Sequence, residues 1–367
     1  MHPANDASFG EIAIKLGFTT LQRVDEVLAL QEKKRARGGE PLKIGELMVR
    51  LGYLTDDQVR KILLHVGAHR GHQEIPGYRL ISRIGQGSTG SVYKALQISM
   101  DRTVAIKVLA SRHASSPTRR ETFLKQARAV ARLNHANLIQ GIDVGVVNGL
   151  HYSVMEFIDG PSVADLLRRG GPIDESRAMT LGGQAAKALA HAYRHGVLHG
   201  DLHPKDLLVS KEGAVKVGGL GMSNHAPAGS ASPYYKSPEQ LRGEKDLDTR
   251  ADVYSLGAIL YHMVTGDVPY PGASPTQVAK AHLEDAVPSP RQKNPQLSAK
   301  ADWVIRKMMF KTRERRHPTP LEVQKDLEEI VGGGTPKGFA PEARPASASP
   351  GPNTRLRRMT RGRGFQH

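Results

Sequence analysis

A glycine-rich segment between two strand-like runs constrains the fold of this chain most strongly. Residues Ile84–Val92 follow the pattern G-x-G-x-x-G-x-V, and the runs 78–84 and 91–97 beside it have the composition of β-strands. Glycines in such a turn let backbone N–H groups approach phosphate oxygens closely. A dinucleotide-binding turn would lead into a helix instead. The segment therefore predicts a meander of strands whose first turn is a nucleotide cradle.

A lysine at the end of an apolar strand supports the same interpretation. Val104–Lys107 reads V-A-I-K and lies in a predicted strand over 103–109. The Lys107 ammonium either meets an anion there or reaches solvent along its apolar stem. Its place after the glycine-rich segment favours the anion. Two further predicted strands, 138–146 and 151–155, complete a small β-rich lobe.

Helical patterns dominate the rest of the central region. One helix is expected inside the β-rich part, and from Val163 onward the sequence is mostly helical. Gly266 and the glycines after Ile330 mark helix ends, where a residue with positive φ is favoured. The predicted helices cover 120–133, 174–195, 251–265 and 319–330.

The segment His199–Gly221 adds His, Asp and Gly residues around two short apolar runs. It resembles the catalytic and metal-binding loops of protein kinases, written H-R-D-x-x-x-x-N and D-F-G. With the two earlier motifs in order before it, residues 77–331 resemble a bacterial, eukaryotic-type Ser/Thr protein kinase domain. The resemblance implies an α+β, bilobal protein-kinase fold with a β-rich N-lobe, a helical C-lobe and ATP in the cleft.

The same resemblance implies roles for individual residues. Asp201 stands in the place of the catalytic base, Lys107 in that of the phosphate-binding lysine, and Met155 in that of the hinge gatekeeper. Ser232–Glu239 resembles the end of the activation segment, and Arg316 stands where the family places the ion-pair partner of Glu239. The nucleotide-binding residues implied in this way are Ile84, Gly85, Gly87, Gly90, Val92, Ala105, Lys107, Glu156, Ile158 and Leu208.

The departures from the family pattern fall on charged positions. Gly219 replaces the metal-binding Asp, Gln126 the Glu that pairs with the strand lysine, and His203 the lysine that contacts the γ-phosphate. Gly200 replaces the Arg of the catalytic loop, a loss that is compatible with activity. Phosphoryl transfer depends on positioning and on charge neutralisation, largely by Mg²⁺. Losing one such group typically reduces the rate by about 10²–10³. Asp206, in the place of the metal-binding Asn, is a carboxylate that could hold one Mg²⁺ ion.

Two functions remain open on these residues. The favoured one is a catalytically impaired pseudokinase that binds ATP with weak or no dependence on Mg²⁺ and acts as a signalling scaffold. The alternative is an active but atypical Ser/Thr kinase that phosphorylates a protein substrate, with Asp201 as base and Asp206 as metal ligand. Two simpler interpretations stay beside them. Asp201 is a structural acid bonded to Ser232 and the loop backbone, or the glycine-rich turn is a tight hairpin beside an empty cleft.

An internal repeat with a constant offset of 35 occupies residues 9–66, for example Leu16–Phe18 and Leu51–Tyr53. Each copy predicts two short helices. Gly17 and Gly52 end the first, Thr20 and Thr55 cap the second, and the copies bury each other's apolar stripes. The repeat is similar to the N-terminal helical repeats of type II secretion and type IV pilus ATPases. Some of those bind a cyclic dinucleotide through an Arg before the Leu/Ile-Gly. Ser8 and Lys43 precede the matching positions here, so docking of a protein partner or self-association is expected instead.

Length and charge complete the domain assignment. The chain of 367 residues has no cysteine and a net charge of +16, and seven basic residues face one acid in 332–367. No signal pattern or membrane-length apolar run is present, so a cytoplasmic protein without a membrane span is expected. The basic tail predicts a solvated segment, with contact to anionic surfaces as the alternative. The predicted divisions are 1–8 disordered, 9–68 helical repeats, 69–76 linker, 77–331 kinase-like domain and 332–367 disordered tail.

Overall fold

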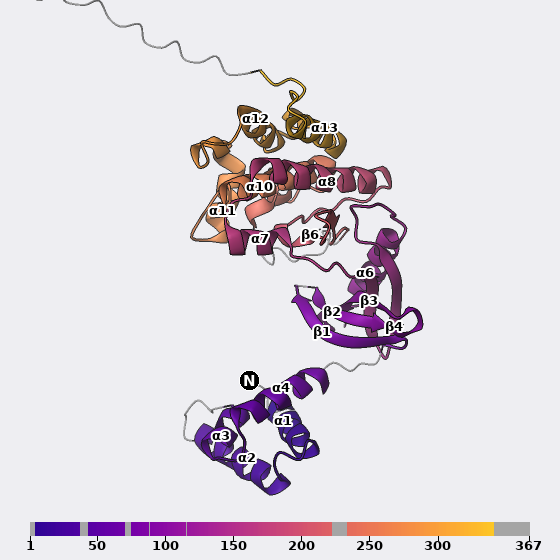
Figure 1. The fold of residues 1–367 in the computed structure, drawn as a ribbon, viewed down its shortest axis with the longest axis vertical. Coiled ribbons are helices and arrows are strands. Elements are labelled where there is room, and N and C mark those ends of the chain that lie inside the picture. Colours follow the sequence, from indigo (N-terminus) through magenta and orange to yellow (C-terminus); the bar gives the residue numbers. More distant parts are fainter. Residues whose placement is uncertain are drawn as a thin grey trace, which may run out of the picture. The chain divides into compact units, whose positions relative to one another are not determined.

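The computed structural model describes residues 4–36, 43–69, 75–87, 89–114, 116–221 and 233–340 (Figure 1). The chain forms two compact units. One comprises Met1–Ala131 with Gly141–Phe157, and the other comprises Arg132–Gln140 with Ile158–His367. None of the helices in these described ranges is both long and apolar enough to cross a membrane.

Four helices form the N-terminal repeat, and the same backbone pattern closes the first helix of each copy. The Phe18 N–H bonds to the carbonyl of Ala13 at 3.0 Å, and the Tyr53 N–H to that of Met48 at 2.8 Å. Gly17 and Gly52, which follow the first helix of each copy, have φ of 69° and 73°, as predicted. Thr55 caps α4 through a bond from the N–H of Gln58. The helices are α1 (Ala4–Lys15), α2 (Leu21–Ala36), α3 (Ile44–Arg50) and α4 (Asp56–His69).

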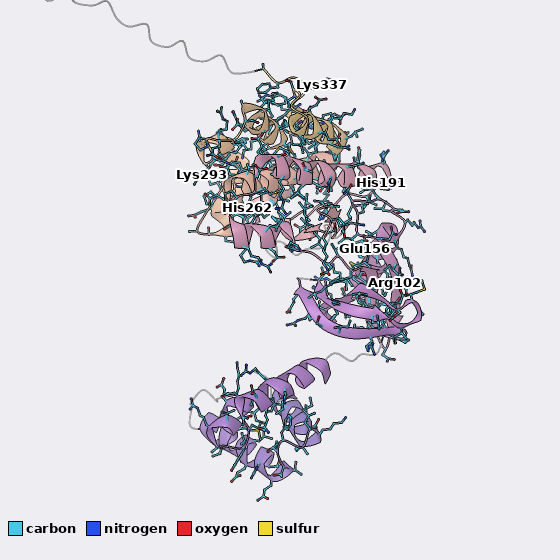
Figure 2. The ribbon with its side chains drawn as sticks, in the orientation of Figure 1. Arg102, Glu156, His191, His262, Lys293 and Lys337 are labelled. Carbon is cyan, nitrogen blue, oxygen red and sulfur yellow. The ribbon has the colours of Figure 1, made fainter. Side chains whose placement is uncertain are left out.

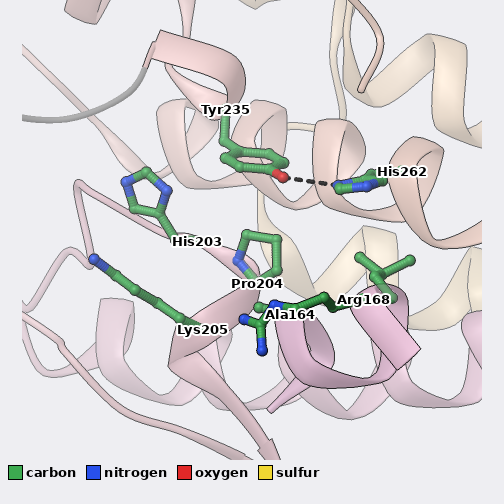
Figure 3. Close-up of a pocket in the computed structure, with 8 residues that line it drawn as sticks. Ala164, Arg168, His203, Pro204, Lys205, Tyr235 and His262 are labelled. Atoms are coloured by element: carbon green, nitrogen blue, oxygen red, sulfur yellow. Dashed lines mark hydrogen bonds between the residues drawn. The ribbon is translucent and has the colours of Figure 1, made fainter. Parts of the chain in front are cut away.

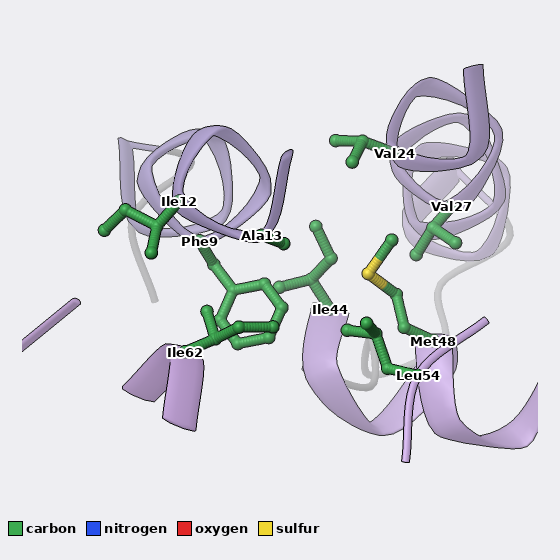
Figure 4. Packing of buried hydrophobic residues seen from close by; sticks show 9 residues of the cluster. All are labelled: Phe9, Ile12, Ala13, Val24, Val27, Ile44, Met48, Leu54 and Ile62. Atoms are coloured by element: carbon green, nitrogen blue, oxygen red, sulfur yellow. The ribbon is translucent and has the colours of Figure 1, made fainter. Parts of the chain in front are cut away.

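The two copies share one core, which confirms that each buries the other's apolar stripe (Figure 4). Helices pack closely where glycine leaves room: a Cβ on Gly45 would lie 3.2 Å from a methyl group of Val59. The first helix begins at Ala4, so the prediction of disorder over residues 1–8 is wrong for 4–8. The buried core residues are Phe9, Ile12, Ala13, Val24, Val27, Ile44, Met48, Leu54 and Ile62.

A five-stranded antiparallel sheet carries the predicted meander, in the order β1-β2-β3-β5-β4. Helix α6 packs against β4 and β5. The predicted strand over 138–146 begins only at Gly141, because Ile139 belongs to the second unit and donates its N–H to the carbonyl of Val217 at 3.0 Å. The elements are β1 (Tyr78–Gln86), β2 (Gly90–Gln97), β3 (Arg102–Leu109), α5 (Ser111–Ala114), α6 (Pro117–Ala131), β4 (Gly141–Val147) and β5 (Leu150–Glu156).

Helices build the second unit around the buried α10 (Figure 1). Helix α8 starts at its cap Asp174, whose carboxylate accepts the N–H of Arg177 at 3.1 Å, and α10 ends at Gly266 with φ of 77°, as predicted. Helix α13 packs on α8 and on α12. The elements are α7 (Val163–Gly170), α8 (Glu175–Arg194), β6 (Leu207–Val209), β7 (Val215–Val217), α9 (Pro238–Leu241), α10 (Thr249–Thr265), α11 (Pro275–Glu284), α12 (Ala299–Met308) and α13 (Pro320–Val331).

The segment after α13 is folded as far as residue 340, which corrects the predicted start of the disordered tail at 332. The Lys337 N–H donates to a carboxylate oxygen of Asp326 at 2.9 Å (Lys337 is labelled in Figure 2). The ring of Phe339 packs edge-on against Trp303 with centroids 5.9 Å apart. These contacts, together with the bonds from the Lys300 ammonium to the carbonyls of Gly333 and Gly334, hold a segment whose composition gave little sign of order.

Candidate functional site

A short β-hairpin in the second unit positions the chemistry-bearing loop. Strands β6 and β7 pair antiparallel, with Leu207 opposite Val217. The 3-10 turn Pro204–Asp206 leads into β6, and Gly218 and Gly219 follow β7. The Gly218 N–H donates to the carbonyl of Asp206 at 2.8 Å, which ties the two ends of the hairpin together.

The start of the loop is held by the buried carboxylate of Asp252 on α10. Its two oxygens accept the N–H groups of His199 at 2.8 Å and Gly200 at 2.7 Å. Gly200 has φ of 71°, a conformation that glycine adopts without strain. The His199 ring donates from Nε2 to the carbonyl of Gly218 at 2.8 Å, while its Nδ1 accepts the Asp201 N–H at 3.4 Å. The His199 ring and the Asp252 carboxylate therefore hold both ends of the hairpin region.

Asp201 faces the ring of His203 and the ammonium group of Lys236. His203 Nε2 lies 3.3 Å and Lys236 Nζ 4.0 Å from its Oδ1 atom. Burial alone would raise the pKa of Asp201, but the hydrogen bond from His203 and the nearby positive charges outweigh burial and lower the pKa. The carboxylate is therefore ionised at neutral pH. Ser232, the predicted side-chain partner of Asp201, lies outside the described residues.

Asp206 and Gly219 lie side by side. A Cβ atom on Gly219 would be 3.1 Å from Asp206 Oδ1 and 3.5 Å from His199 Nε2. The other oxygen of Asp206 accepts the His203 N–H at 3.0 Å. Burial is the main influence on the Asp206 carboxyl and raises its pKa. One carboxylate oxygen therefore points at the place where the family pattern has a second acid.

These residues fit a magnesium site poorly. Mg²⁺ in phosphate-transferring sites is held by one or two carboxylates together with substrate phosphates. Asp206 could supply one oxygen, but Gly219 supplies no side chain. Across the described parts of the chain, no group of three or more His, Asp or Glu side chains is arranged to hold a metal ion. The loop therefore lacks the two-residue ligand set that the family pattern calls for.

The predicted nucleotide cradle lies in the first unit, in the turn between β1 and β2. The Gly87 N–H bonds to the carbonyl of Gly90 at 2.8 Å, which closes the turn. A Cβ on Gly90 would lie 1.9 Å from the carbonyl oxygen of Val108, so only glycine fits there. Lys107 on β3 is partly buried and lies opposite Val92 in the strand register. The turn, the lysine and the buried Ala105 thus lie on three adjacent strands of one sheet.

The remaining predicted residues are distributed over both units. Ile84 on β1 is 48% exposed, and Glu156 ends β5. Ile158 belongs to the second unit, as does Leu208 on β6. Gln126 lies partly buried on α6. The predicted nucleotide-binding residues therefore fall into two groups, one in each unit.

The predicted ion pair of Arg316 and Glu239 is confirmed. Both guanidinium NH groups meet the carboxylate, at 2.6 and 2.8 Å, and both side chains are buried. Burial would raise the pKa of Glu239, but the bonds from Arg316 outweigh burial and lower the pKa. The same guanidinium donates to the carbonyl of Phe310 at 2.7 Å. The pair ties the short helix α9 to the loop that precedes α13.

Two features of the loop were not expected from the sequence. His203 was expected in the place of a phosphate-binding lysine, yet its ring bonds to Asp201 and packs edge-on against Tyr235 with centroids 5.5 Å apart. Lys236 near Asp201 was also not expected. Lys236 lies 35 positions from Asp201 in the chain, and no periodic or motif signal links the two.

A β-rich unit with a glycine-rich first turn, joined to a helical unit that carries this loop, defines a protein kinase domain. The sequence matches the family model described as "Protein kinase domain" over residues 78–326. The chain belongs to the protein kinase family.

Individual relatives agree with that assignment. The probable serine/threonine-protein kinase CPE1738 of Clostridium perfringens is 35% identical over 261 residues, which cover 69% of this chain and 38% of the relative. The serine/threonine-protein kinase PknB of Mycolicibacterium smegmatis is 35% identical over 274 residues, covering 71% and 44%. This chain therefore spans about four tenths of the length of these relatives.

A solved structure shows the same fold. The crystal structure of the PknI kinase domain of Mycobacterium tuberculosis superposes with a TM-score of 0.56 at 23% identity, covering 69% of this chain and 96% of that one. At this level of identity the likeness concerns the fold alone.

Proposed function

We propose that this protein is a pseudokinase, which binds ATP through its kinase domain, transfers phosphate poorly and acts as a signalling scaffold. The observation that carries the proposal is Gly219, which offers no metal ligand beside Asp206. Losing one preorganised charge-stabilising group slows a reaction by about 10²–10³. Gln126 and His203 remove further positive or charge-balancing groups from the family pattern, and such losses do not simply add.

The surroundings of Asp201 support the same proposal. A general base works best when its pKa lies near the working pH. Here His203 and Lys236 lower the pKa of Asp201 below its ordinary value. Asp201 therefore accepts a proton weakly, and its hydrogen bond to His203 gives it a structural role in the loop.

Phosphotransfer from radiolabelled ATP tests the catalytic part of the proposal. We expect the full chain to label itself and a general protein substrate no faster than the Asp201→Asn variant, with Mg²⁺ or Mn²⁺ present. Strong Mg²⁺-dependent labelling that Asp201→Asn abolishes would overturn the proposal. If Asp206→Ala also abolished that labelling, Asp206 would be the metal ligand of an active kinase.

Nucleotide binding is proposed on the closed glycine turn and on Lys107, and it is tested separately by thermal shift. ATP at about 100 times its Kd stabilises a folded protein by about 2.7 kcal/mol. We expect an ATP-dependent rise in melting temperature that is similar with Mg²⁺ and with EDTA, and that Lys107→Met reduces. A melting temperature that ignores millimolar ATP in both conditions contradicts nucleotide binding.

We place the scaffold role on the N-terminal repeats, as a docking site for a protein partner. The shared core leaves Leu21 63% exposed and Leu51 41% exposed, so apolar side chains remain available on this domain. Sedimentation of the full chain, compared with the Leu21→Glu variant, tests self-association as one form of docking. A monomer that captures no partner through this domain would contradict the scaffold role.

A further inference from the structure

A pocket of about 360 Å³ lies beside the candidate catalytic loop, wholly within the second unit (Figure 3). Helix α7, the turn Pro204–Asp206, the 3-10 turn Pro233–Tyr235 and helix α10 each contribute to its walls. Its volume falls within the range of about 300–1,000 Å³ that is usual for ligand pockets. The lining residues are Ala164, Leu167, Arg168, His203, Pro204, Lys205, Tyr235 and His262.

The back of the pocket is uncharged, and a hydrogen bond joins its two polar side chains. The Tyr235 hydroxyl donates to His262 Nδ1 at 2.8 Å, and Figure 3 shows this bond beside the Pro204 ring. Burial lowers the pKa of His262, so its imidazole is neutral at physiological pH. Ala164 and Leu167 add aliphatic surface. This part of the pocket favours methylene groups, because the Tyr235 hydroxyl and His262 Nδ1 already bond to each other.

The charged residues of the lining are all basic. Lys205 is exposed, and within the described ranges no hydrogen bond or ion pair engages its ammonium group. Arg168 bonds to Asp165 at 2.9 Å, but its side chain is 71% exposed. Such an exposed pair contributes little energy, so the guanidinium can turn to another anion at small cost. Among the described residues that line the pocket, none is Asp or Glu.

We propose that this pocket binds an acidic side chain of a peptide segment from another protein. The aliphatic wall suits the methylenes of a Glu or Asp residue, and Lys205 and Arg168 suit its carboxylate. A free inorganic anion would leave the apolar wall without a partner. Residues 341–367 carry an excess of Arg over Glu, which repels them from a basic pocket and favours an acidic segment of another molecule as the occupant.

His203 gives the pocket a defined place relative to Asp201. Its ring lines the pocket, and its Nε2 atom bonds to Asp201 at 3.3 Å. A peptide anchored here by an acidic residue therefore passes next to the carboxylate in the place of the catalytic base. The proposal needs neither bound nucleotide nor phosphotransfer, so it holds or fails independently of the proposed pseudokinase function.

Fluorescence anisotropy with the full chain and no nucleotide tests the proposal. The probe is a short labelled peptide of alternating Glu and Ala, and its counterpart has Gln in place of every Glu. We expect the Glu peptide to bind and the Gln peptide to bind at least about tenfold more weakly. Lys205→Glu and Arg168→Glu should each weaken Glu-peptide binding by about tenfold, a loss typical of one charge contact.

Lys325→Glu is the matched control, because Lys325 is an exposed lysine on α13 that does not line the pocket. Equal loss in Lys325→Glu and Lys205→Glu would mean that the peptide follows the net charge of the protein, and would overturn the proposal. Absence of Glu-peptide binding to the unaltered chain would also overturn it. So would competition by inorganic phosphate that displaces the peptide completely at low millimolar concentration, since a simple anion site would then suffice.

Discussion

Returning an acid to position 219 should create a strong electrostatic conflict with Asp206. In Gly219→Asp the new Cβ lies 3.1 Å from Asp206 Oδ1 and 3.3 Å from its carboxyl carbon. Two carboxylate charges about 4 Å apart repel by about 4 kcal/mol at an effective dielectric constant of about 20. That energy corresponds to about three pKa units. Since burial already raises the pKa of Asp206, one of the two carboxyls should hold a proton near neutral pH.

Gly219→Asn is the control, because it has the same shape and suffers the same strain at φ of 76° without a charge. We expect the Asp variant to melt below the Asn variant at pH 8. A carboxyl whose folded pKa is raised contributes stability that is present at low pH and lost as pH rises through that pKa. The gap between the two variants should therefore shrink as pH falls towards about 4. Thermal melts of both variants from pH 4.5 to 8.5 measure this gap.

Adding Mg²⁺ and combining two substitutions provide further tests of the interaction between positions 219 and 206. Mg²⁺ with ATP should raise the melting temperature of Gly219→Asp more than that of Gly219→Asn, because a cation neutralises paired carboxylates. The double variant Gly219→Asp with Asp206→Asn restores the ligand pair of the family pattern without the repulsion. Its phosphotransfer rate should exceed that of the unaltered chain, by up to about 10²–10³. Identical melting temperatures for the Asp and Asn variants at every pH would refute the reasoning, since position 219 would then not face the Asp206 charge.

Three further predictions concern the framework around the site. Arg316→Ala leaves a buried carboxylate unpaired and should destabilise the protein by about 3–5 kcal/mol, and urea unfolding that shows a loss below about 1 kcal/mol would contradict this. Gly90→Ala meets the carbonyl of Val108 at 1.9 Å, so thermal shift without nucleotide should show lower stability. Gly85→Ala has its nearest contact at 3.7 Å and should keep the stability of the unaltered chain. Burial lowers the pKa of Lys311 from 10.5 to about 8, so between these two pH values the unfolded chain binds more protons than the folded chain and the free energy of unfolding should rise with pH. This rise should be smaller in Lys311→Met. Equal slopes of stability against pH in the two proteins would show that Lys311 does not cause the rise.

Local sequence signals predicted the backbone well at positions where the geometry favours one residue type. Gly17 and Gly52 were expected at helix ends and adopt the required positive φ. The offset of 35 between the copies predicted the shared core, since equivalent apolar positions must face each other. The pair Arg316 and Glu239 was implied by the resemblance to the kinase family and is buried as a bidentate contact. The helix ends and the shared core rest on local signals or on a constant spacing, whereas the ion pair rests on the family resemblance.

The failures involve contacts between segments that are distant in sequence. Phe339 looked like an isolated aromatic residue in a polar tail, and it packs on Trp303, which lies 36 positions earlier. The pocket beside the loop depends on Tyr235 meeting His262, and neither residue belongs to a periodic pattern. Ile139 was predicted to lie in a strand over 138–146, but its N–H bonds to the carbonyl of Val217 instead. In each case a contact with a residue distant in sequence determines the local structure, and secondary-structure propensity does not encode such contacts.

The contacts that hold the loop are separate from the groups that phosphoryl transfer requires. Asp252 fixes the loop through two backbone N–H groups, and Arg316 fixes the segment after it through Glu239. Neither interaction uses Gly219 or a metal ion. A substitution at 219 can therefore remove a metal ligand while the loop and its pocket keep their shape. This separation explains in physical terms how a kinase domain can lose turnover and keep binding surfaces, and it predicts that Asp252→Ala would disturb peptide binding while Gly219→Asn would not.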